Sequence, residues 1–243
     1  MNANAYSEDQ MLQAGTADFF AQHLGWRTEY AFEREDFGPA SLLGRAHRGE
    51  TVLVRELRRA LKKLNPKAPA AAVEAAIQIL VADDAGKNLV QINEDKHQLL
   101  LNGVEVEVRD QAGQLGKHVL RVIDFKTPTE NDFLMVRELW VEGLQPRRAD
   151  LVGFVNGLPL LFVELKRYDK DVKLGFDKNL ADYKRDIRHL FFFNAFVVLS
   201  NGHDALFGSI TSPWEHFYRW RRLNESDLMP PKEAPLRAEG QRV

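Results

Sequence analysis

The stretch RRADLVGFVNGLPLLFVELKR, from Arg147 to Arg167, decides the fold. Two apolar runs, 150–155 and 158–165, flank the pair Asn156-Gly157. An Asn-Gly pair between such runs is a strong β-hairpin signal, because both residues tolerate the left-handed backbone of tight turns. The runs are almost continuously apolar, which is typical of strands buried on both faces. The stretch therefore predicts two central strands of a buried sheet.

Three ionisable side chains lie at the outer ends of these two strands: Asp150, Glu164 and Lys166. Glu164 and Lys166 are two residues apart, so they share a face of their strand. A two-residue loop would pair position 150 with position 163 and turn Asp150 away from Glu164. A three-residue loop, or an equivalent bulge, pairs 150 with 164. We predict the second arrangement, in which the three side chains converge.

Two carboxylates beside a lysine suit the hydrolysis of a phosphodiester. Asp150 and Glu164 can hold one or two Mg²⁺ ions, with water and phosphate oxygens completing the octahedron. Lys166 can orient the attacking water or stabilise the developing negative charge. The spacing alone also fits an ordinary surface salt bridge, although charges that end an apolar strand are costly unless they are used or paired.

Hydrophobic periodicity predicts the other elements and their grouping. The order of these elements indicates an α/β (α+β) fold with a mixed central sheet flanked by helices. We expect one domain, 1–223, in which a helical lobe at about 1–92 precedes a sheet core at about 98–223. The predicted helices are 7–24, 51–64, 69–82, 174–188 and 213–223. The predicted strands are a hairpin about Asn102-Gly103 within 98–109, then 119–125, 132–141 and 193–200, followed by a loose tail, 224–243.

Composition narrows the class of protein. The 243 residues include no cysteine, which excludes disulfides, thiolate catalysis and cysteine zinc sites. The polar segment 1–7 lacks the features of a secretory signal, and no apolar run approaches the roughly 20 residues that span a bilayer, so we expect a cytoplasmic protein with no membrane partner. The net charge of −2 does not decide for or against nucleic acid. The sequence has no P-loop motif for ATP.

The stretch ADLVGFVNGLPLLFVELK resembles the nuclease signature of the restriction (R) subunits of type I restriction-modification enzymes. The resemblance extends over about residues 10–222. It is carried by SLLGRAHRGETVLVRELRRALKKLNP (41–66), LLLNGVEVEVRDQAGQ, VIDFKTPTENDFLMV, LADYKRDIRHLFFFNAFVVLSNGHDALFGS and EHFYRW.

This resemblance implies a restriction-endonuclease-like PD-(D/E)xK core, Mg²⁺ dependence and cleavage of double-stranded DNA. The matching catalytic positions are Asp150, Glu164 and Lys166, with Asp150 and Glu164 as the metal ligands. It also implies methyltransferase and specificity subunits as partners, and ATP-driven translocase domains that follow the nuclease domain in the full-length enzyme. We therefore expect this chain to be a fragment or truncated product that does not itself bind ATP.

Two departures from the family pattern concern the site. The family usually carries Gln and Tyr four residues apart after the catalytic strand, whereas this sequence has Asn179 and Tyr183. They share a helix face, but Asn is one methylene shorter, so a solvated Asn179 is the alternative. Such nucleases also often add an acidic residue from the first helix, and Glu8, Asp9 and Asp18 are open candidates.

Basic residues near the predicted site are candidate DNA contacts. We favour Lys184, Arg185 and Arg188, which follow Tyr183, over the basic face of 55–63. Arg167, Lys170 and Lys173 are similarly placed candidates. Contacts of this kind would be independent of sequence and sensitive to salt.

Two other functions remain open. One is a non-cleaving DNA-binding or subunit-docking module on the same fold. The other is a related nuclease, such as a resolvase or transposase, that would prefer branched DNA.

Overall fold

The computed structural model describes residues 3–32, 34–83, 86–109 and 113–220, with side chains from residue 11 onward. Its centre is a seven-stranded mixed sheet in the order β1-β4-β5-β6-β7-β8-β9. The strands are β1 (Arg27–Tyr30), β4 (Phe133–Val141), β5 (Arg147–Val155), β6 (Leu158–Leu165), β7 (Phe196–Ser200), β8 (Ala205–Gly208) and β9 (Tyr218–Arg219). The β1/β4 and β6/β7 pairs are parallel and the others antiparallel.

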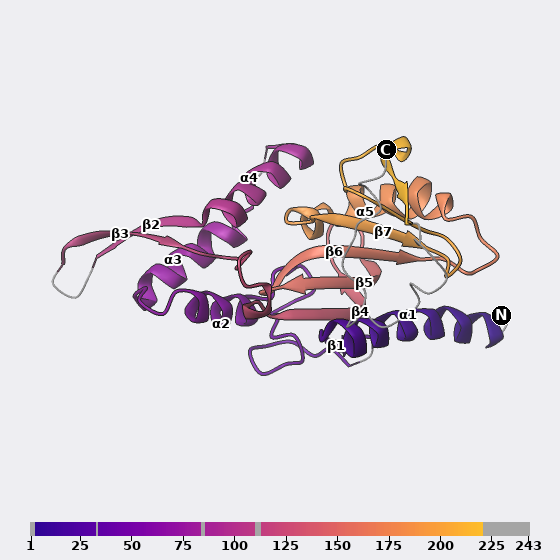
Figure 1. The fold of residues 1–243 in the computed structure, drawn as a ribbon, viewed down its shortest axis with the longest axis horizontal. Coiled ribbons are helices and arrows are strands. Elements are labelled where there is room, and N and C mark those ends of the chain that lie inside the picture. Colours follow the sequence, from indigo (N-terminus) through magenta and orange to yellow (C-terminus); the bar gives the residue numbers. More distant parts are fainter. Residues whose placement is uncertain (1–2, 33, 84–85, 110–112, 221–243) are drawn as a thin grey trace.

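Helices cover both faces of the central strands (Figure 1). Helix α1 (Ala3–Leu24) packs Ala17 and Phe20 against Leu151, Leu161 and Val163 on one face. The opposite face receives a π-helical turn (Gly175–Leu180), helix α5 (Ala181–Asp186) and a 3₁₀ turn (Arg188–Phe191). Alternate residues of each strand thus point into two separate cores, as the continuous apolar runs predict.

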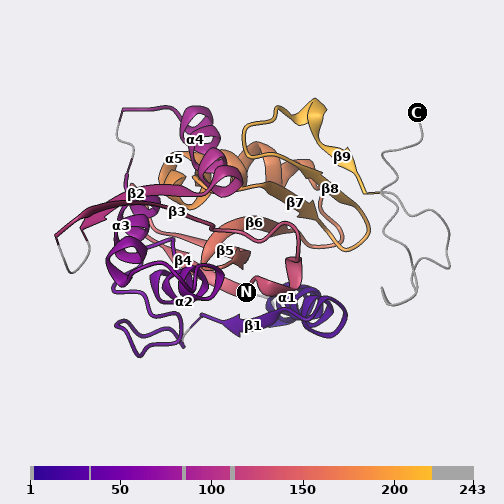
Figure 2. The same ribbon diagram turned by 60° about the vertical axis from the view of Figure 1, so that its left-hand side comes forward.

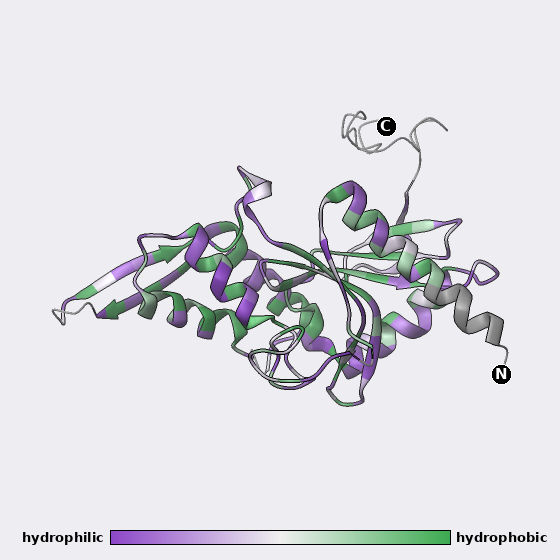
Figure 3. Cartoon of the chain, turned by 90° about the horizontal axis from the view of Figure 1, so that it is seen from below, coloured by the Kyte–Doolittle hydropathy of each residue, from purple (hydrophilic) through white to green (hydrophobic). Residues whose placement is uncertain are grey.

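A second lobe projects from one end of the sheet (Figures 1 and 2). It comprises α2 (Val54–Leu64), α3 (Ala70–Val81), α4 (Leu89–Asn102) and the two-stranded arm of β2 (Val104–Arg109) and β3 (Leu115–Leu120). Its core joins Leu57, Ile77, Ile92 and Val106 and also includes residues 155 and 158 of the central sheet. Hydrophobic and hydrophilic residues alternate along its helices (Figure 3), as expected for helices that bury one face.

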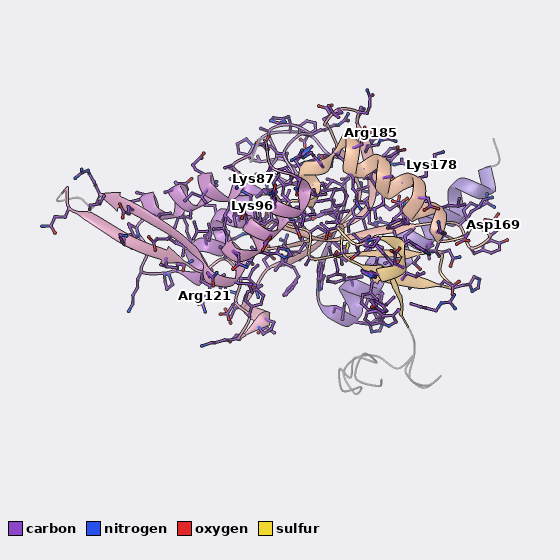
Figure 4. All side chains as sticks on the ribbon, turned by 90° about the horizontal axis from the view of Figure 1, so that it is seen from above. Lys87, Lys96, Arg121, Asp169, Lys178 and Arg185 are labelled. Carbon is purple, nitrogen blue, oxygen red and sulfur yellow. The ribbon has the colours of Figure 1, made fainter. Side chains whose placement is uncertain are left out.

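A buried lysine links two helices of this lobe. Lys96, which is 2% exposed, donates from α4 to the carbonyls of Ile79, Leu80 and Ala82 at the end of α3 (Figure 4). A helix leaves its last carbonyls without partners, and a cation supplies both hydrogen bonds and favourable charge there.

The Asn156-Gly157 turn joins β5 and β6 and anchors the lobe to the sheet. Both residues have positive φ, 52° and 81°. The buried Asn156 amide donates to the Val122 carbonyl, and the Gly157 carbonyl accepts from the Leu53 amide at the start of α2, each at 2.8 Å. The predicted β-hairpin is confirmed, and its turn is a structural contact between the two lobes.

The register between β5 and β6 confirms the predicted bulge. Val155 pairs with Leu158 and Phe154 with Pro159, but Gly153 pairs with Leu161, which leaves Leu160 as the extra residue. From that point Leu151 lies opposite Val163. The turn therefore has two residues, and a bulge on β6 restores the register that places position 150 opposite position 164.

Three element predictions are wrong. Residues 98–102 end helix α4, so 98–109 is not a hairpin: Asn88 forms a capping box at the start, and Gly103 closes the helix with φ 83°. The predicted strand 119–125 starts earlier, in β3, and stops at Leu120. Within 213–220 there is a 3₁₀ turn, Trp214–His216, and β9 rather than a longer helix. The remainder of that helix and the predicted loose tail lie outside the described residues.

No helix within the described ranges is long and apolar enough to span a membrane.

Candidate active site

An open cavity of about 790 Å³ lies where β5 and β6 end beneath the segment 175–186. The predicted residues Asp150, Glu164, Lys166, Asn179 and Tyr183 all line it. Arg148, Arg167, Lys170 and Lys178 also line it. The fold therefore brings the predicted catalytic set together in one cleft with a basic wall.

The Asp150 carboxylate is held by hydrogen bonds to both of its oxygens. The Leu165 amide donates to Oδ2 at 2.8 Å, and the Gln13 side chain donates to Oδ1 at 3.2 Å. Burial raises the pKa of Asp150 well above its ordinary value, and the nearby charge of Glu164 raises it further. The backbone hydrogen bond, Lys166 and Arg148 oppose this rise in pKa. The surroundings of Asp150 thus carry too little positive charge to offset the cost of burying its ionised form.

Glu164 is 2% exposed and has one oxygen with partners and one without. Lys166 Nζ donates to Oε1 at 2.7 Å, and the Asn179 amide donates to the same oxygen. Oε2 is buried and accepts no hydrogen bond from the described residues. Burial raises the pKa of Glu164, while Lys166, Tyr183 and Asn179 oppose that rise. A buried carboxylate oxygen without a partner is costly unless a ligand completes it.

The segment 175–186 places Asn179 and Tyr183 over the strands. Its first turn is π-helical, a form that is frequent at functional sites. Gly175 packs directly against the site: a Cβ at this position would lie 3.5 Å from both Glu164 Cγ and Lys166 Cε. Asn179 reaches Glu164 despite its shorter side chain, and the Tyr183 hydroxyl donates to the Arg148 carbonyl at 3.0 Å. Burial and the neighbouring carboxylates raise the pKa of Tyr183, so it stays protonated.

The predicted DNA contacts Lys184, Arg185 and Arg188 do not line the cavity. The Lys184 ammonium lies over the Phe176 ring, where burial lowers its pKa. Arg185 is paired with Asp182 and Asp186 (Figure 4 shows its place on the helix). Arg188 donates to the Lys87 carbonyl. Their role as DNA contacts stays a prediction.

The basic side chains of 55–63, the less favoured candidates for DNA contact, mostly form ion pairs within the protein. Arg55 and Arg59 pair with Glu56, Arg58 pairs with Glu74, and Lys63 pairs with Glu130.

Helix α1 contributes a glutamine to the site. Gln13 is buried and contacts Asp150, whereas Asp18 is exposed. The side chains of Glu8 and Asp9 lie outside the described part. The signal that sequence reasoning missed is the spacing of Gln13 and Ala17, four residues apart on the buried helix face. Phe19 and Leu24, two large apolar residues of the same helix, are exposed.

The donor set fits a magnesium ion. Mg²⁺ in proteins typically takes one or two carboxylates and fills its other positions with water and phosphate oxygens. Asp150 and Glu164 supply those carboxylates, and the unpaired Glu164 Oε2 is an oxygen that a cation would complete. The described residues contain no cluster of three or more acidic, histidine or cysteine side chains that could enclose a metal by themselves.

Comparison with known proteins places this arrangement in a family. Residues 5–216 match the family described as "Type I restriction enzyme R protein N terminus". The chain is 33% identical over 211 residues to the type I restriction enzyme HindI endonuclease subunit of Haemophilus influenzae, a match that covers 85% of this chain and 20% of that protein. It is 31% identical over 137 residues to a putative type I restriction enzyme MjaIXP endonuclease subunit of Methanocaldococcus jannaschii, covering 54% and 13% of the two chains.

The chain therefore spans about a fifth of the length of the Haemophilus relative. The mixed seven-stranded sheet with helices on both faces is consistent with the restriction-endonuclease-like core that the resemblance implies. Because the family match covers most of the sequence, the chain belongs to the type I restriction enzyme R protein N-terminal family.

Proposed function

We propose that this chain is a Mg²⁺-dependent endonuclease module that hydrolyses phosphodiester bonds of double-stranded DNA without reading its sequence. The observation that carries the proposal is the convergence of Asp150, Glu164 and Lys166 in one cleft, with a buried Glu164 oxygen left without a partner. The names of the relatives, which are endonuclease subunits of type I restriction enzymes, support it.

The side chains divide the chemistry among them. Asp150 and Glu164 would hold Mg²⁺, which when bound acidifies water and screens phosphate charge. Lys166 is held by its hydrogen bond to Glu164 Oε1 and lines the cleft, where its other N–H groups would serve an attacking water or a phosphate oxygen. Asn179 and Gln13 keep the two carboxylates in place. Water adds to phosphorus, one P–O ester bond breaks, and the leaving oxygen takes a proton.

We also propose the setting in which this module acts. Its partners would be the methyltransferase and specificity subunits of a restriction-modification complex in the cytoplasm, which would supply target recognition. ATP would serve translocase domains of the full-length enzyme and would not bind this chain.

The test is metal binding combined with DNA cleavage. Titration of Mg²⁺ or Mn²⁺ by calorimetry would compare the wild type with Asp150→Ala and Glu164→Ala, and the same samples would be assayed for plasmid nicking. Glu105→Ala, on the exposed arm, is the matched control because it removes a carboxylate far from the cleft. We expect both site variants to lose metal binding and nicking, and the control to keep them.

Three outcomes would count against the proposal. Metal binding that survives both substitutions would place the metal elsewhere. A wild type that binds no metal, even with a short duplex present, but retains affinity for DNA would favour the non-cleaving binding or docking module. A strong preference for branched over plain duplex would favour a resolvase-like nuclease.

A further inference from the structure

Arg148 is a cation in the cleft whose hydrogen-bonding capacity the described residues leave largely unused. It lies on β5, two residues before Asp150, and lines the same cavity. Among the described residues, its closest carboxylate oxygen is Glu138 Oε2, which is 3.7 Å from Nη1 and too far for a hydrogen bond. By contrast, Arg147, Lys166 and Arg167 each have a carboxylate oxygen within 3.2 Å. Lys170, in the same cavity wall, resembles Arg148 in lying 3.7 Å from its carboxylate, that of Asp169.

The guanidinium of Arg148 is nevertheless held in place. Its Cζ lies 4.9 Å from the centroid of the half-buried Phe32 ring, in a cation–π contact. Glu138, on the neighbouring strand β4, attracts it as well. An arginine that is oriented by a ring and a distant charge loses little conformational entropy on binding and keeps its N–H groups for a ligand.

Glu138 has an unusual backbone for a strand residue. Its φ is 52°, and its side chain is almost fully buried. Arg137 pairs with Leu151 and Leu139 pairs with Ala149, so the register places Glu138 opposite Asp150. These two residues do not themselves form a β-bridge. A left-handed, non-glycine residue inside a strand is strained, and such strain is found mostly at functional sites. The Tyr30 hydroxyl donates to Glu138 Oε2 at 3.4 Å and fixes it further.

We infer that Arg148 is a phosphate-contact residue of this site, positioned by Glu138 and Phe32 to bind a DNA phosphate beside the one held at Asp150 and Glu164. The planar guanidinium matches two phosphate oxygens, which a lysine cannot do. The inference rests on the proposed function, because it assigns Arg148 to the DNA that the module would cleave. It also explains why a strained residue lies beside Asp150.

The test measures DNA binding. Fluorescence anisotropy of a labelled 16-base-pair duplex would be recorded over a salt series, with Ca²⁺ in place of Mg²⁺ so that the duplex stays intact. Arg148→Gln is expected to bind on the order of ten-fold more weakly, since one charge-assisted contact is lost. The slope of log affinity against log salt should fall by about 1. Arg148→Lys should keep the salt slope but lose part of the affinity.

The matched control is Arg109→Gln, on the arm, which removes one exposed arginine far from the cleft. Thermal melting of each variant would verify that it is folded. If Arg148→Gln binds as tightly as Arg109→Gln, the inference is overturned while the proposed function stands. If the wild type itself does not bind the duplex at any salt concentration, the proposed function fails and this inference fails with it.

The positioning role of Glu138 has its own readout. Glu138→Gln keeps the shape of the side chain but removes the charge that orients Arg148. It should weaken duplex binding in the wild type and add nothing in the Arg148→Gln background, a non-additivity that measures their coupling. Equal losses in both backgrounds would show that Glu138 acts through the fold alone and would overturn its positioning role.

Discussion

The main-chain amide of Leu165 donates to Asp150 Oδ2 across 2.8 Å, so the strand that carries Glu164 also holds the carboxylate opposite it. That hydrogen bond favours an ionised Asp150, yet burial and the charge of Glu164 still raise its pKa well above the ordinary value. Two acids with raised pKa values, Asp150 and Glu164, are therefore kept close together in the folded chain. The ionised forms of such a pair repel each other, and a bound cation would reduce that repulsion.

The burial of these two acids, with the repulsion that Asp150 feels from Glu164, predicts how stability depends on pH. Since the folded pKa of each acid lies above its unfolded value, near 4, the folded state keeps protons that the unfolded state has released. The contribution of these acids to the unfolding free energy should fall as the pH rises from about 4 through the folded pKa values. Asp150→Asn should raise Tm at pH 7.5 in EDTA, by about 2–4 °C for each kcal/mol relieved.

The measurement is thermal melting of the wild type and Asp150→Asn from pH 4 to pH 8. The difference in Tm should widen with pH and shrink when Mg²⁺ is added to the wild type. The control is Asp169→Asn, which removes an exposed loop charge. A constant difference across the pH range would contradict the prediction.

Asn179 should tune the pH at which the site accepts metal. Its amide donates to Glu164 Oε1, and this hydrogen bond lowers the pKa of Glu164 against the rise due to burial. Asn179→Ala removes the bond, so the carboxylate must lose its proton at a higher pH. We expect the pH midpoint of Mn²⁺ binding to move upward, measured by calorimetry between pH 5 and 8. Gln98→Ala, an exposed amide on α4, should leave it unchanged; a midpoint that moves downward in Asn179→Ala would refute the assignment.

Gln13 should support metal binding from outside the carboxylate pair. It is the residue of α1 that contacts Asp150, and loss of such an outer partner typically weakens metal affinity about 10- to 100-fold. Gln13→Leu keeps the volume and removes the donor, so Mn²⁺ should bind more weakly while the fold is retained. Asp18→Asn, on the exposed face of the same helix, is the matched control. Equal affinities for the two variants would leave Gln13 with a packing role only.

Gly157 should be intolerant of a side chain for steric reasons. A Cβ there would lie 2.5 Å from the Leu53 carbonyl oxygen and 2.7 Å from the Leu57 nitrogen, both in the backbone at the start of α2. Gly113 has nearly the same φ, 80° against 81°, but open space around it. Gly157→Ala should cost about 1–3 kcal/mol more in unfolding free energy than Gly113→Ala, measured by urea denaturation. Similar losses would mean that α2 can move aside.

Local chemistry was enough to predict the strands that carry the site. The apolar runs and Asn156-Gly157 predicted β5 and β6, and the need to bring Asp150 opposite Glu164 predicted the bulge that the structure contains at Leu160. The pair Asn102-Gly103 was misleading, because a glycine with positive φ ends a helix as readily as it turns a hairpin. The capping box at Asn88 and Gln91 was the signal for that helix.

Other features of the site depend on contacts between distant parts of the chain. Gln13 meets Asp150 across 137 positions, and no local pattern specifies which helix residue will reach a given strand. The left-handed Glu138 likewise carries no sequence signal, since glutamate rarely adopts that conformation. Arg148 and Glu138 become a pair only because β4 and β5 lie side by side.

The place of the second lobe has a consequence for the order of folding. Strand β1 pairs in parallel with β4, and Arg27 lies opposite Leu134 with the whole lobe between them in the chain. Closing so long a loop is slow compared with forming the hairpin of β5 and β6. We expect the lobe, which supplies most of one hydrophobic core, to form first and to shorten the effective distance between β1 and β4. Helix α1 would then be among the last elements to dock, so that the carboxylates acquire their final partner, Gln13, only in the finished protein.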